Sequence, residues 1–292
     1  MTALRALLEG IVDYAGLFPP AELDMQSAVR NYASYRVDPA SWMLGRFVVP
    51  VARLDEFSVA RASVDGGTDL WRLSALLGGD PASDVERVRR FNSVQRERAV
   101  IDSLEGKCGD PDEIEHAAEV VGQELELFAE LPLDRDPTPL VAAVKRSGIK
   151  AKMRTGGVVA SAVPSAASVV RFMRACLDAD VAFKATAGLH HPLRAFYRLT
   201  YDHGGPTGLM FGYLNVFLAA AFLAQGMTDD DTIRLLDERD SSSFVFRDDS
   251  ISWNGFTLSE SQLREAREHV AVAFGSCSFR EPVDELRSVA SV

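Results

Sequence analysis

Cationic side chains alternate with apolar ones in the segment Ile149-Lys-Ala-Lys-Met-Arg-Thr155. Successive side chains of a β-strand point to opposite faces, so Lys152 and Arg154 share one face with the lysine before them. The segment Val181-Ala-Phe-Lys-Ala-Thr-Ala187 places Lys184 in the middle of a second short run. A buried ammonium group either needs a carboxylate partner or loses its proton. We therefore expect the surroundings of these lysines to set their charge state.

Two interpretations of Lys152 follow from its expected burial. In the first, Lys152 forms a structural ion pair with Glu130, which lies in the preceding apolar segment on the adjacent strand. In the second, burial and a second cation, Lys184, lower the pKa of Lys152 and leave a free amine that attacks a carbonyl carbon. The sequence leaves both interpretations open.

Histidines and a further carboxylate near segment ends are also candidates for chemistry. His190 and His191 follow the second lysine segment, and an imidazole is suited to general acid–base chemistry because its unperturbed pKa is about 6.5. Together with Glu130 and Glu105, the two histidines form a candidate divalent-metal site of nitrogen and oxygen ligands. Asp13 lies at the end of the first candidate strand, where a carboxylate is suited to orient a hydroxylated substrate.

Eight short apolar segments recur along the chain, with helical patterns between them. The segments are 11–15, 46–54, 70–77, 98–104, 125–131, 149–155, 181–187 and 270–274. Asp80-Pro81 and Asp110-Pro111 predict two helix starts, because aspartate caps a helix and proline fits its first turn. Alternating strands and helices imply parallel strands joined by right-handed crossovers. Eight such units, without a Gly-x-Gly-x-x-Gly motif after the first, predict an α/β fold of the closed (β/α)8 TIM-barrel type.

The segments depart from even spacing once, between the seventh and the eighth. We interpret residues 190–268 as an elaborated helix and an insertion near the mouth of the barrel, within a single domain that covers 1–292. This region holds an uncharged apolar stretch at 208–224 and a hairpin-like piece at 243–256. Active-site residues of such barrels lie at the carboxyl ends of the strands, so we expect the candidate residues to meet there.

Short motifs in the last four segments resemble those of a known family. The runs Ala151-Lys-Met-Arg-Thr-Gly-Gly157 and Phe183-Lys-Ala-Thr-Ala-Gly-Leu189 are similar to the sixth and seventh strands of deoxyribose-phosphate aldolases. The segment at 127–130 and the tail at 273–278 are also similar to their counterparts there. The resemblance covers about a third of the chain and implies a barrel with class I aldolase chemistry.

In this resemblance, Lys152 corresponds to the lysine that forms a Schiff base, and Lys184 to the neighbour that tunes it. Asp102 corresponds to the carboxylate that relays protons, with Glu130 as the second candidate for that role. The resemblance also implies backbone loops that hold an anionic group of the substrate. Together with the residues discussed above, the candidate substrate-binding residues are Arg154, Thr155, Gly156, Gly157, Gly188, His190, His191, Gly275, Ser276 and Asp13.

The composition limits the classes of partner. Among 292 residues, 31 Lys and Arg against 42 Asp and Glu give a net charge of −11, which argues against nucleic acid or an anionic membrane. Three widely spaced cysteines form neither a disulfide framework nor a zinc motif, which fits a cytoplasmic protein. The stretch 208–224 is too short for a membrane span and instead indicates a buried helix or a homo-oligomer interface. No motif indicates a cofactor.

Three functions remain open at this point. The first is an aldolase-like carbon–carbon lyase that acts through a lysine imine on a small carbonyl substrate with a phosphate or carboxylate group. The second is a metal-dependent barrel lyase, isomerase or hydrolase that uses His190, His191 and Glu130. The third is a non-catalytic barrel whose cations simply bind an anion.

Overall fold

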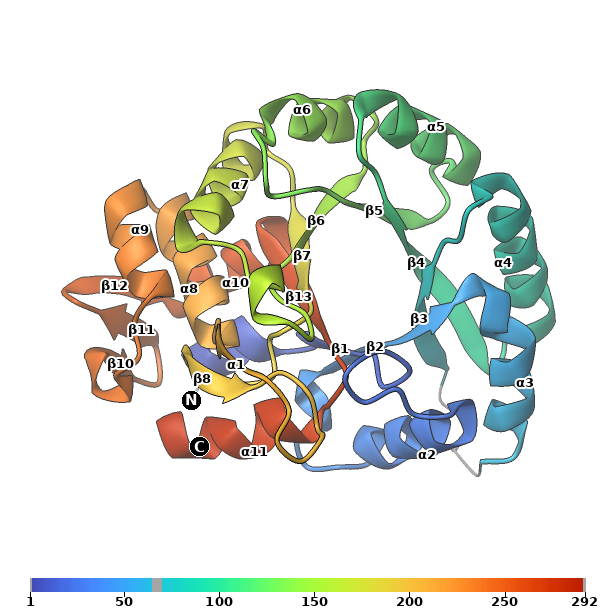
Figure 1. Ribbon diagram of the computed structural model, residues 1–292, viewed down its shortest axis with the longest axis horizontal. Coiled ribbons are helices and arrows are strands. Elements are labelled where there is room, and N and C mark those ends of the chain that lie inside the picture. The colour runs from blue at the N-terminus through green and yellow to red at the C-terminus, as the bar shows by residue number, and fades with distance from the viewer. Residues whose placement is uncertain (1, 65–69, 291–292) are drawn as a thin grey trace.

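Eight parallel strands form a closed barrel in the computed structural model, which describes residues 2–64 and 70–290 (Figure 1). In barrel order the strands are β1 (Val12–Tyr14), β2 (Leu44–Pro50), β3 (Trp71–Leu76), β4 (Ala99–Lys107), β5 (Glu126–Glu130), β6 (Lys150–Arg154), β7 (Phe183–Thr186) and β13 (Ala271–Ser276). Each of the eight predicted apolar segments overlaps one of these strands, although β2 begins before its segment and β4 and β13 end after theirs. The predicted (β/α)8 TIM-barrel fold is therefore confirmed.

Helices surround the strands as the alternation predicted (Figure 1). The helices of the ring are α2 (Met25–Arg36), α3 (Leu54–Ala62), α4 (Pro81–Gln95), α5 (Pro111–Val121), α6 (Thr138–Arg146), α7 (Ala166–Asp178), α8 (Tyr213–Ala224) and α11 (Arg280–Val289), and short 3-10 turns occur at η1 (Ser41–Met43), η2 (Val51–Arg53), η3 (Ala160–Ala162) and η4 (Ser241–Ser243). Asp80 and Asp110 accept hydrogen bonds from backbone N–H groups of the first turns of α4 and α5, each followed by proline. Both predicted caps are confirmed.

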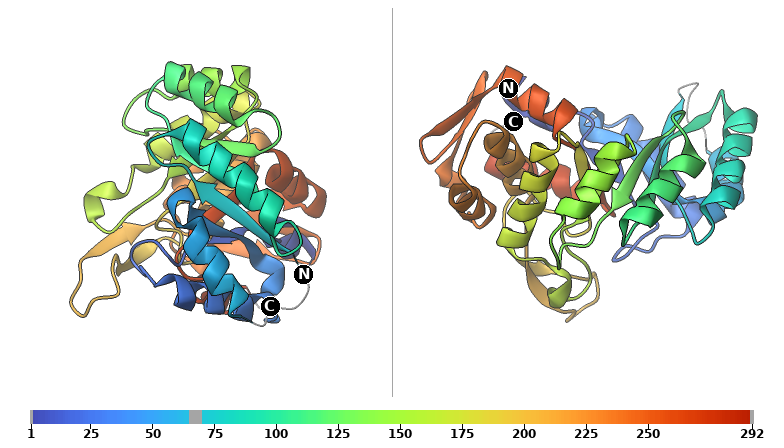
Figure 2. Two further views of the ribbon diagram at one scale, coloured as in Figure 1. Left: turned by 90° about the vertical axis from the view of Figure 1, so that its right-hand side faces the viewer. Right: turned by 90° about the horizontal axis from the view of Figure 1, so that it is seen from above.

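The long connection between β7 and β13 begins with an antiparallel hairpin that the sequence analysis missed. Its strands are β8 (Ala195–Arg198) and β9 (Thr207–Met210). Because β9 occupies the start of the apolar stretch 208–224, helix α8 begins only at Tyr213. Figure 2 shows the hairpin projecting from one end of the barrel together with the loop that carries η3.

The rest of this connection forms α9 (Asp229–Leu236), a small antiparallel sheet and α10 (Glu260–His269). The sheet consists of β10 (Phe244–Phe246), β11 (Ser250–Trp253) and β12 (Phe256–Ser259), so the predicted hairpin gains a third strand. It lies outside the ring beside α9 (Figure 1). The backbone N–H of Ala3, in α1 (Thr2–Leu8), donates to the Asp248 carbonyl at 2.8 Å. The sheet therefore packs near the helix that precedes β1. Of the region expected near the mouth of the barrel, the β8–β9 hairpin is the part that lines the cavity described below.

Helix α8 is covered within this chain. Every residue from Tyr213 to Leu223 is buried, and the ring of Tyr213 stacks on Phe274 of β13 with centroids 5.4 Å apart. The apolar stretch that suggested a homo-oligomer interface thus finds its packing partners inside the barrel shell. In the described residues, no helix has the length and apolar character that a membrane crossing requires.

Candidate functional site

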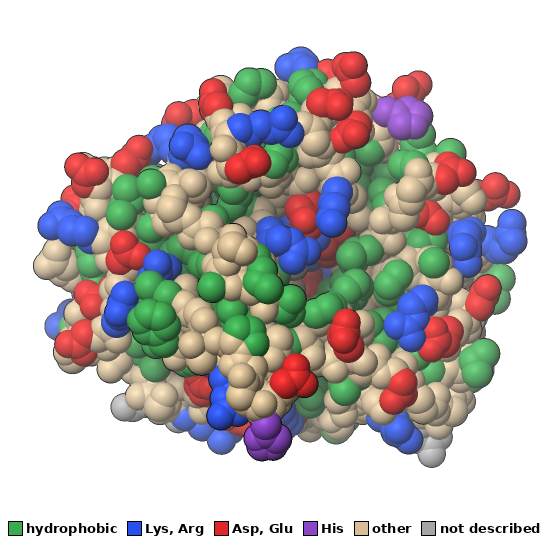
Figure 3. All heavy atoms as spheres, in the orientation of Figure 1, with side chains coloured by type: hydrophobic (Ala, Val, Ile, Leu, Met, Phe, Trp, Pro, Cys, Tyr) green, Lys and Arg blue, Asp and Glu red, His purple; other side chains and the backbone are tan. Residues whose placement is uncertain are grey.

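A cavity of ≈600 Å³ opens at the carboxyl-terminal ends of the barrel strands. Its wall consists of strand ends and of the loops that follow them, and the β8–β9 hairpin contributes residues that include Arg198, Tyr201 and Met210. In Figure 3 a hollow near the centre of the molecule contains charged side chains of both signs, with hydrophobic side chains around it. This is the end of the barrel where enzymes of this fold carry their chemistry.

Lys152 lies on β6 at the wall of this cavity, with 4% of the residue exposed. Its Nζ atom is 2.7 Å from Glu105 Oε2 and 2.8 Å from Glu130 Oε2. Glu105 comes from β4 and Glu130 from the intervening strand β5. The ion pair expected between Lys152 and Glu130 is present, but a second carboxylate shares the ammonium group.

Lys184 lies beside Lys152 on the neighbouring strand, where the two residues are register partners. Its Nζ atom is 2.6 Å from Asp13 Oδ2 and 2.7 Å from Glu105 Oε1. Unlike Lys152, it is not among the residues that line the cavity. Burial favours the neutral amine, but Asp13 and Glu105 outweigh it and raise the pKa of Lys184 above its usual range. Lys184 is therefore a cation at neutral pH.

Glu105 connects the two lysines through one carboxylate. Its Oε2 atom contacts Lys152, and its Oε1 atom contacts Lys184 and also accepts a hydrogen bond from the Ser74 hydroxyl at 2.7 Å. Burial alone would raise the pKa of Glu105, but the two ammonium groups outweigh burial and hold the pKa well below its usual range. Glu105 was expected only as a metal ligand, whereas the structure makes it the carboxylate shared by both lysines.

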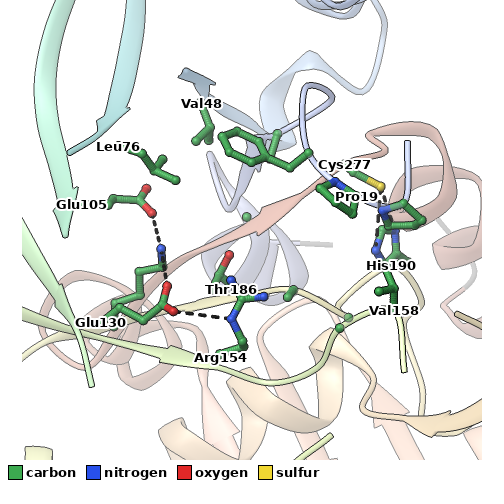
Figure 4. A pocket seen from close by; sticks show the side chains of 18 of the residues that line it. Pro19, Val48, Leu76, Glu105, Glu130, Arg154, Val158, Thr186, His190 and Cys277 are labelled. Carbon is green, nitrogen blue, oxygen red and sulfur yellow. Dashed lines mark hydrogen bonds and ion pairs between the residues drawn. The ribbon is translucent and has the colours of Figure 1, made fainter. Parts of the chain in front are cut away.

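Glu130 forms the outer edge of this cluster. Burial would raise the pKa of Glu130, but Lys152 first and then Arg154 and Lys107 lower it. The Nε atom of Arg154 is 3.4 Å from Glu130 Oε1, and 47% of the arginine side chain is exposed to the cavity mouth and solvent. Figure 4 shows this chain of contacts from Glu105 through an amine to Glu130 and Arg154.

Asp13, a predicted substrate-binding residue, is buried below the cavity. Its Oδ2 atom pairs with Lys184, and its Oδ1 atom accepts the backbone N–H of Arg46 at 2.7 Å. The residue is 1% exposed and is not among the residues that line the cavity. Its position favours a role in holding Lys184 as a cation over direct contact with a substrate.

Asp102, the predicted proton relay, lies near the opposite end of the barrel. Its carboxylate is 2.6 Å from Arg46 Nε and 2.5 Å from Arg72 Nε, and Arg46 also pairs with Glu126 at 3.2 Å. These partners lie in the first half of their strands, so Asp102 belongs to an ion network at the amino-terminal end. The relay role expected for Asp102 does not fit this position, and Glu105 occupies the place beside the lysines.

A β-bulge in β4 explains why Glu105, and not Asp102, lies beside the lysines. Leu73 and Ser74 are consecutive on β3, but they pair with Ile101 and Ser103 on β4. Asp102 is therefore the extra residue, and a bulge of this kind changes which side chains share a face. The alternation that follows the bulge places Ser103 beside Ser74, with their hydroxyl oxygens 3.2 Å apart, and carries Glu105 into the barrel.

The two histidines do not form a metal site with Glu130. His190 Nδ1 is 3.0 Å from Glu281 Oε2, and His191 Nδ1 is 2.8 Å from Glu285 Oε2, both on α11. In the described part of the chain, no three His, Cys, Asp or Glu side chains are arranged to hold a metal ion. The predicted ligand set is therefore not assembled. Both histidines line the cavity, so their acid–base role stays a prediction.

The loops that follow β6 and β7 touch each other beside the cavity. A Cβ atom built on Gly156 would lie 3.0 Å from the Gly188 Cα atom, and Gly188 has a φ of 78° that favours glycine. Thr155 supports the contact, because its hydroxyl donates to the Ala187 carbonyl at 2.7 Å. Of the candidate substrate-binding residues, those lining the cavity are Arg154, Gly157, Gly188, His190, His191 and Gly275, whereas Thr155, Gly156, Ser276 and Asp13 are not among the lining residues.

Several cavity residues were not predicted. Arg198 and Tyr201 come from the missed hairpin, and Glu281 comes from the first turn of α11. Cys277, which was not singled out either, lines the cavity beside His190. No local motif marks these residues, because each depends on how distant segments pack.

No family model matches this chain. A search of curated proteins finds no match either, so the similarity to deoxyribose-phosphate aldolases rests on the motifs alone. One similar solved structure is a lysine/ornithine decarboxylase complexed with cadaverine from Vibrio vulnificus, with 9% sequence identity and a TM-score of 0.41. That match covers 94% of this chain, and this chain spans 58% of the decarboxylase chain.

A second similar structure is the catalytic domain of a hyperthermophilic chitinase from Pyrococcus furiosus. Its sequence identity is 10% and its TM-score is 0.37, over 62% of this chain and 73% of the chitinase chain.

Proposed function

We propose that this protein is an enzyme that forms an imine between Lys152 and a small carbonyl substrate, and that it makes or breaks a carbon–carbon bond next to that imine. The observation that carries the proposal is the position of two neighbouring lysines. Lys152 lines the cavity with carboxylates at 2.7 and 2.8 Å from its amine, while Lys184 lies beside it as a buried cation. A reachable amine next to bases and a fixed positive charge is the arrangement that imine chemistry needs.

The carboxylates around Lys152 support a route by which its ammonium group loses a proton. Lys152 shares Glu105 with Lys184, so the carboxylate nearest to Lys152 is already partly neutralised by another cation. A carbonyl compound that enters the cavity displaces water from around the amine. Glu130, within hydrogen-bond reach of Lys152, then takes the proton and leaves the nucleophilic amine.

The proposed reaction needs only the substrate, water and the side chains of the cavity. The Lys152 nitrogen adds to the carbonyl carbon, and loss of water from the adduct gives a protonated imine. When the adjacent carbon–carbon bond breaks, its electron pair moves toward the imine nitrogen, and a carboxylate takes the proton from the β-hydroxyl group of the departing aldehyde. Protonation of the resulting enamine carbon and addition of water release the second fragment and restore the amine.

The cavity mouth favours a substrate with an anionic group. Arg154 and Arg198 line the mouth together with Lys107, whereas Glu105 and Glu130 face the two buried lysines. An anionic end group can therefore lie among the outer cations while the carbonyl carbon reaches Lys152. This arrangement fits a phosphorylated or carboxylated carbonyl compound.

Reductive trapping tests the proposal. We expect sodium borohydride to fix acetaldehyde or pyruvate onto the protein and add the mass of one reduced adduct to the peptide that contains Lys152. Lys152→Met should abolish the adduct while the far-ultraviolet circular dichroism spectrum stays unchanged. Lys150→Met is the matched control, because Lys150 is on the same strand but pairs with Glu126 and does not line the cavity.

Two results would contradict the proposal. One is trapping that is equal in Lys152→Met and in the unaltered protein, which would assign the adduct to surface lysines. The other is the absence of an adduct with both probes, combined with a rise in melting temperature on addition of inorganic phosphate, which would favour a barrel that only binds anions.

A further inference from the structure

The cavity wall opposite Lys152 carries a second cluster of reactive groups. Cys277 follows β13 and lines the cavity with 6% of the residue exposed. Its Sγ atom lies 3.9 Å from both His190 Nδ1 and His190 Nε2. Figure 4 shows His190 and Cys277 on one side of the cavity and Glu105 with Glu130 on the other. None of the steps assigned to Lys152 uses this thiol.

The imidazole of His190 is held in its charged form by its neighbours. Glu281 Oε2 is 3.0 Å from His190 Nδ1, and the Tyr201 hydroxyl donates to the same carboxylate oxygen at 2.9 Å. Burial would lower the pKa of His190, but Cys277 and Glu281 outweigh burial and raise the pKa to about 10. The ring is therefore an imidazolium at neutral pH, and it lies within reach of the thiol.

Other titratable groups that face the pair come from the same loop as His190, from the β8–β9 hairpin and from β1. Tyr201, in the hairpin turn, has its hydroxyl 3.6 Å from Cys277 Sγ. His191 acts on His190 as a like charge when it is protonated, and burial lowers its pKa. Tyr14 of β1 interacts with Cys277, and burial raises the pKa of Tyr14 above its usual range. These neighbours leave His190 as the cation next to the sulfur.

The other two cysteines have the opposite surroundings. Burial, followed by the carboxylates of Glu113 and Asp110, raises the pKa of Cys108 to about 11. Burial alone raises the pKa of Cys176. Both residues are therefore neutral thiols at physiological pH, and the thiolate is the form that attacks electrophiles.

We propose that Cys277 and His190 form a thiolate–imidazolium pair, and that Cys277 is a covalent modification site for electrophilic carbon compounds small enough to enter the cavity. The sulfur forms a bond to the electrophilic carbon, and the leaving group departs with the electron pair of the bond that breaks. His190 keeps its proton throughout and holds the thiolate before the reaction. The proposal does not depend on imine formation at Lys152.

Competitive alkylation tests this pair. With a limiting amount of iodoacetamide at pH 7, we expect Cys277 to be alkylated about tenfold faster than Cys108 and Cys176, measured by mass spectrometry of the three peptides. The rate at Cys277 should stay high as the pH falls below the usual thiol pKa of about 8.5. Equal rates at the three cysteines, or a pH midpoint for Cys277 near that usual value, would overturn the proposal.

Two histidine variants separate the pair from general effects on the loop. His190→Gln should slow alkylation of Cys277 about tenfold at pH 7 and move its midpoint toward the usual thiol pKa. His191→Gln is the matched control, because His191 is the next residue but pairs with Glu285, and it should leave the rate at Cys277 unchanged. An unchanged rate in His190→Gln would contradict the pair. If His190→Gln unfolds, Glu281→Gln replaces it, and a slower reaction at Cys277 is again expected.

Discussion

Glu105 illustrates how much one buried carboxylate determines at this site. It is 4% exposed, and each of its oxygens contacts a different ammonium group. A buried charge without a partner is strongly destabilising, whereas a fully paired group is tolerated. Removal of Glu105 therefore takes one carboxylate contact from each lysine and leaves Lys184 with Asp13 and Lys152 with Glu130.

The pH dependence of stability tests this set. Because its pKa is below the usual value of 4.5 in the folded protein, Glu105 stabilises the fold above that pH, and the contribution is lost as the pH falls below it. Glu105→Gln should lower the free energy of unfolding by about 3 kcal/mol at pH 7, because a charged contact to each of the two lysines is lost. The difference from the unaltered protein should shrink toward pH 3, measured by urea denaturation at each pH.

Asp102→Asn is the comparison for this experiment. Asp102 is a carboxylate on the same strand, but it pairs with Arg46 and Arg72 away from the lysines. We expect Asp102→Asn to keep reductive trapping at Lys152, whereas Glu105→Gln should lose most of it. A loss of trapping in Asp102→Asn alone would restore Asp102 as the relay residue.

The contrast between Asp102 and Glu105 shows the limit of sequence reasoning at the scale of residues. The two lysines were correctly expected on adjacent strands, because consecutive units of the barrel place their strands side by side. A bulge cannot be read from the same pattern, since it depends on the register between β3 and β4. Because Asp102 is the extra residue of the bulge, Glu105 and not Asp102 lies between the two lysines.

At the scale of elements, the loops after β6 and β7 depend on a close approach of two glycines. Gly156→Ala would place a Cβ atom 3.0 Å from the Gly188 Cα atom, and backbone cannot move aside as a flexible side chain can. We expect this substitution to cost about 1–3 kcal/mol and to reduce trapping at Lys152. Urea denaturation and borohydride trapping measure the two effects.

Gly79→Ala is the control for that substitution. Gly79 also lines the cavity, but a Cβ atom built on it meets nothing within 4 Å. The control should therefore change neither stability nor trapping. Equal effects of the two substitutions would show that the contact between the loops has no particular importance.

Most elements of the barrel could be predicted, because each strand is a short apolar segment bounded by turn residues. The β8–β9 hairpin could not be predicted in the same way. Its strands have alternating burial but also expose Phe196, which is 68% exposed, and the connection through 199–206 lacks the two-residue turn that marks a hairpin. The uncharged residues of β9 also continue directly into α8 and were interpreted as part of one helix.

At the scale of the whole molecule, the two ends of the barrel carry different charged groups: an ion network at the amino-terminal end and the cavity at the carboxyl-terminal end. Arg46 joins Asp102 and Glu126 at the amino-terminal end, where neither carboxylate lines the cavity. Arg46→Met should lower the free energy of unfolding by about 2 kcal/mol, because two charged hydrogen bonds are lost. Trapping at Lys152 should persist at temperatures where the variant remains folded, and its loss there would show that the two ends are coupled.

The cavity wall has two structural parts. The lysines and their carboxylates sit on barrel strands, whereas part of the cavity wall belongs to a hairpin that is appended to the barrel. The sequence and length of this hairpin can change without disturbing the barrel strands beneath it. Under the proposed function, changes in the hairpin would alter which molecules enter the cavity and leave the lysines and their carboxylates in place.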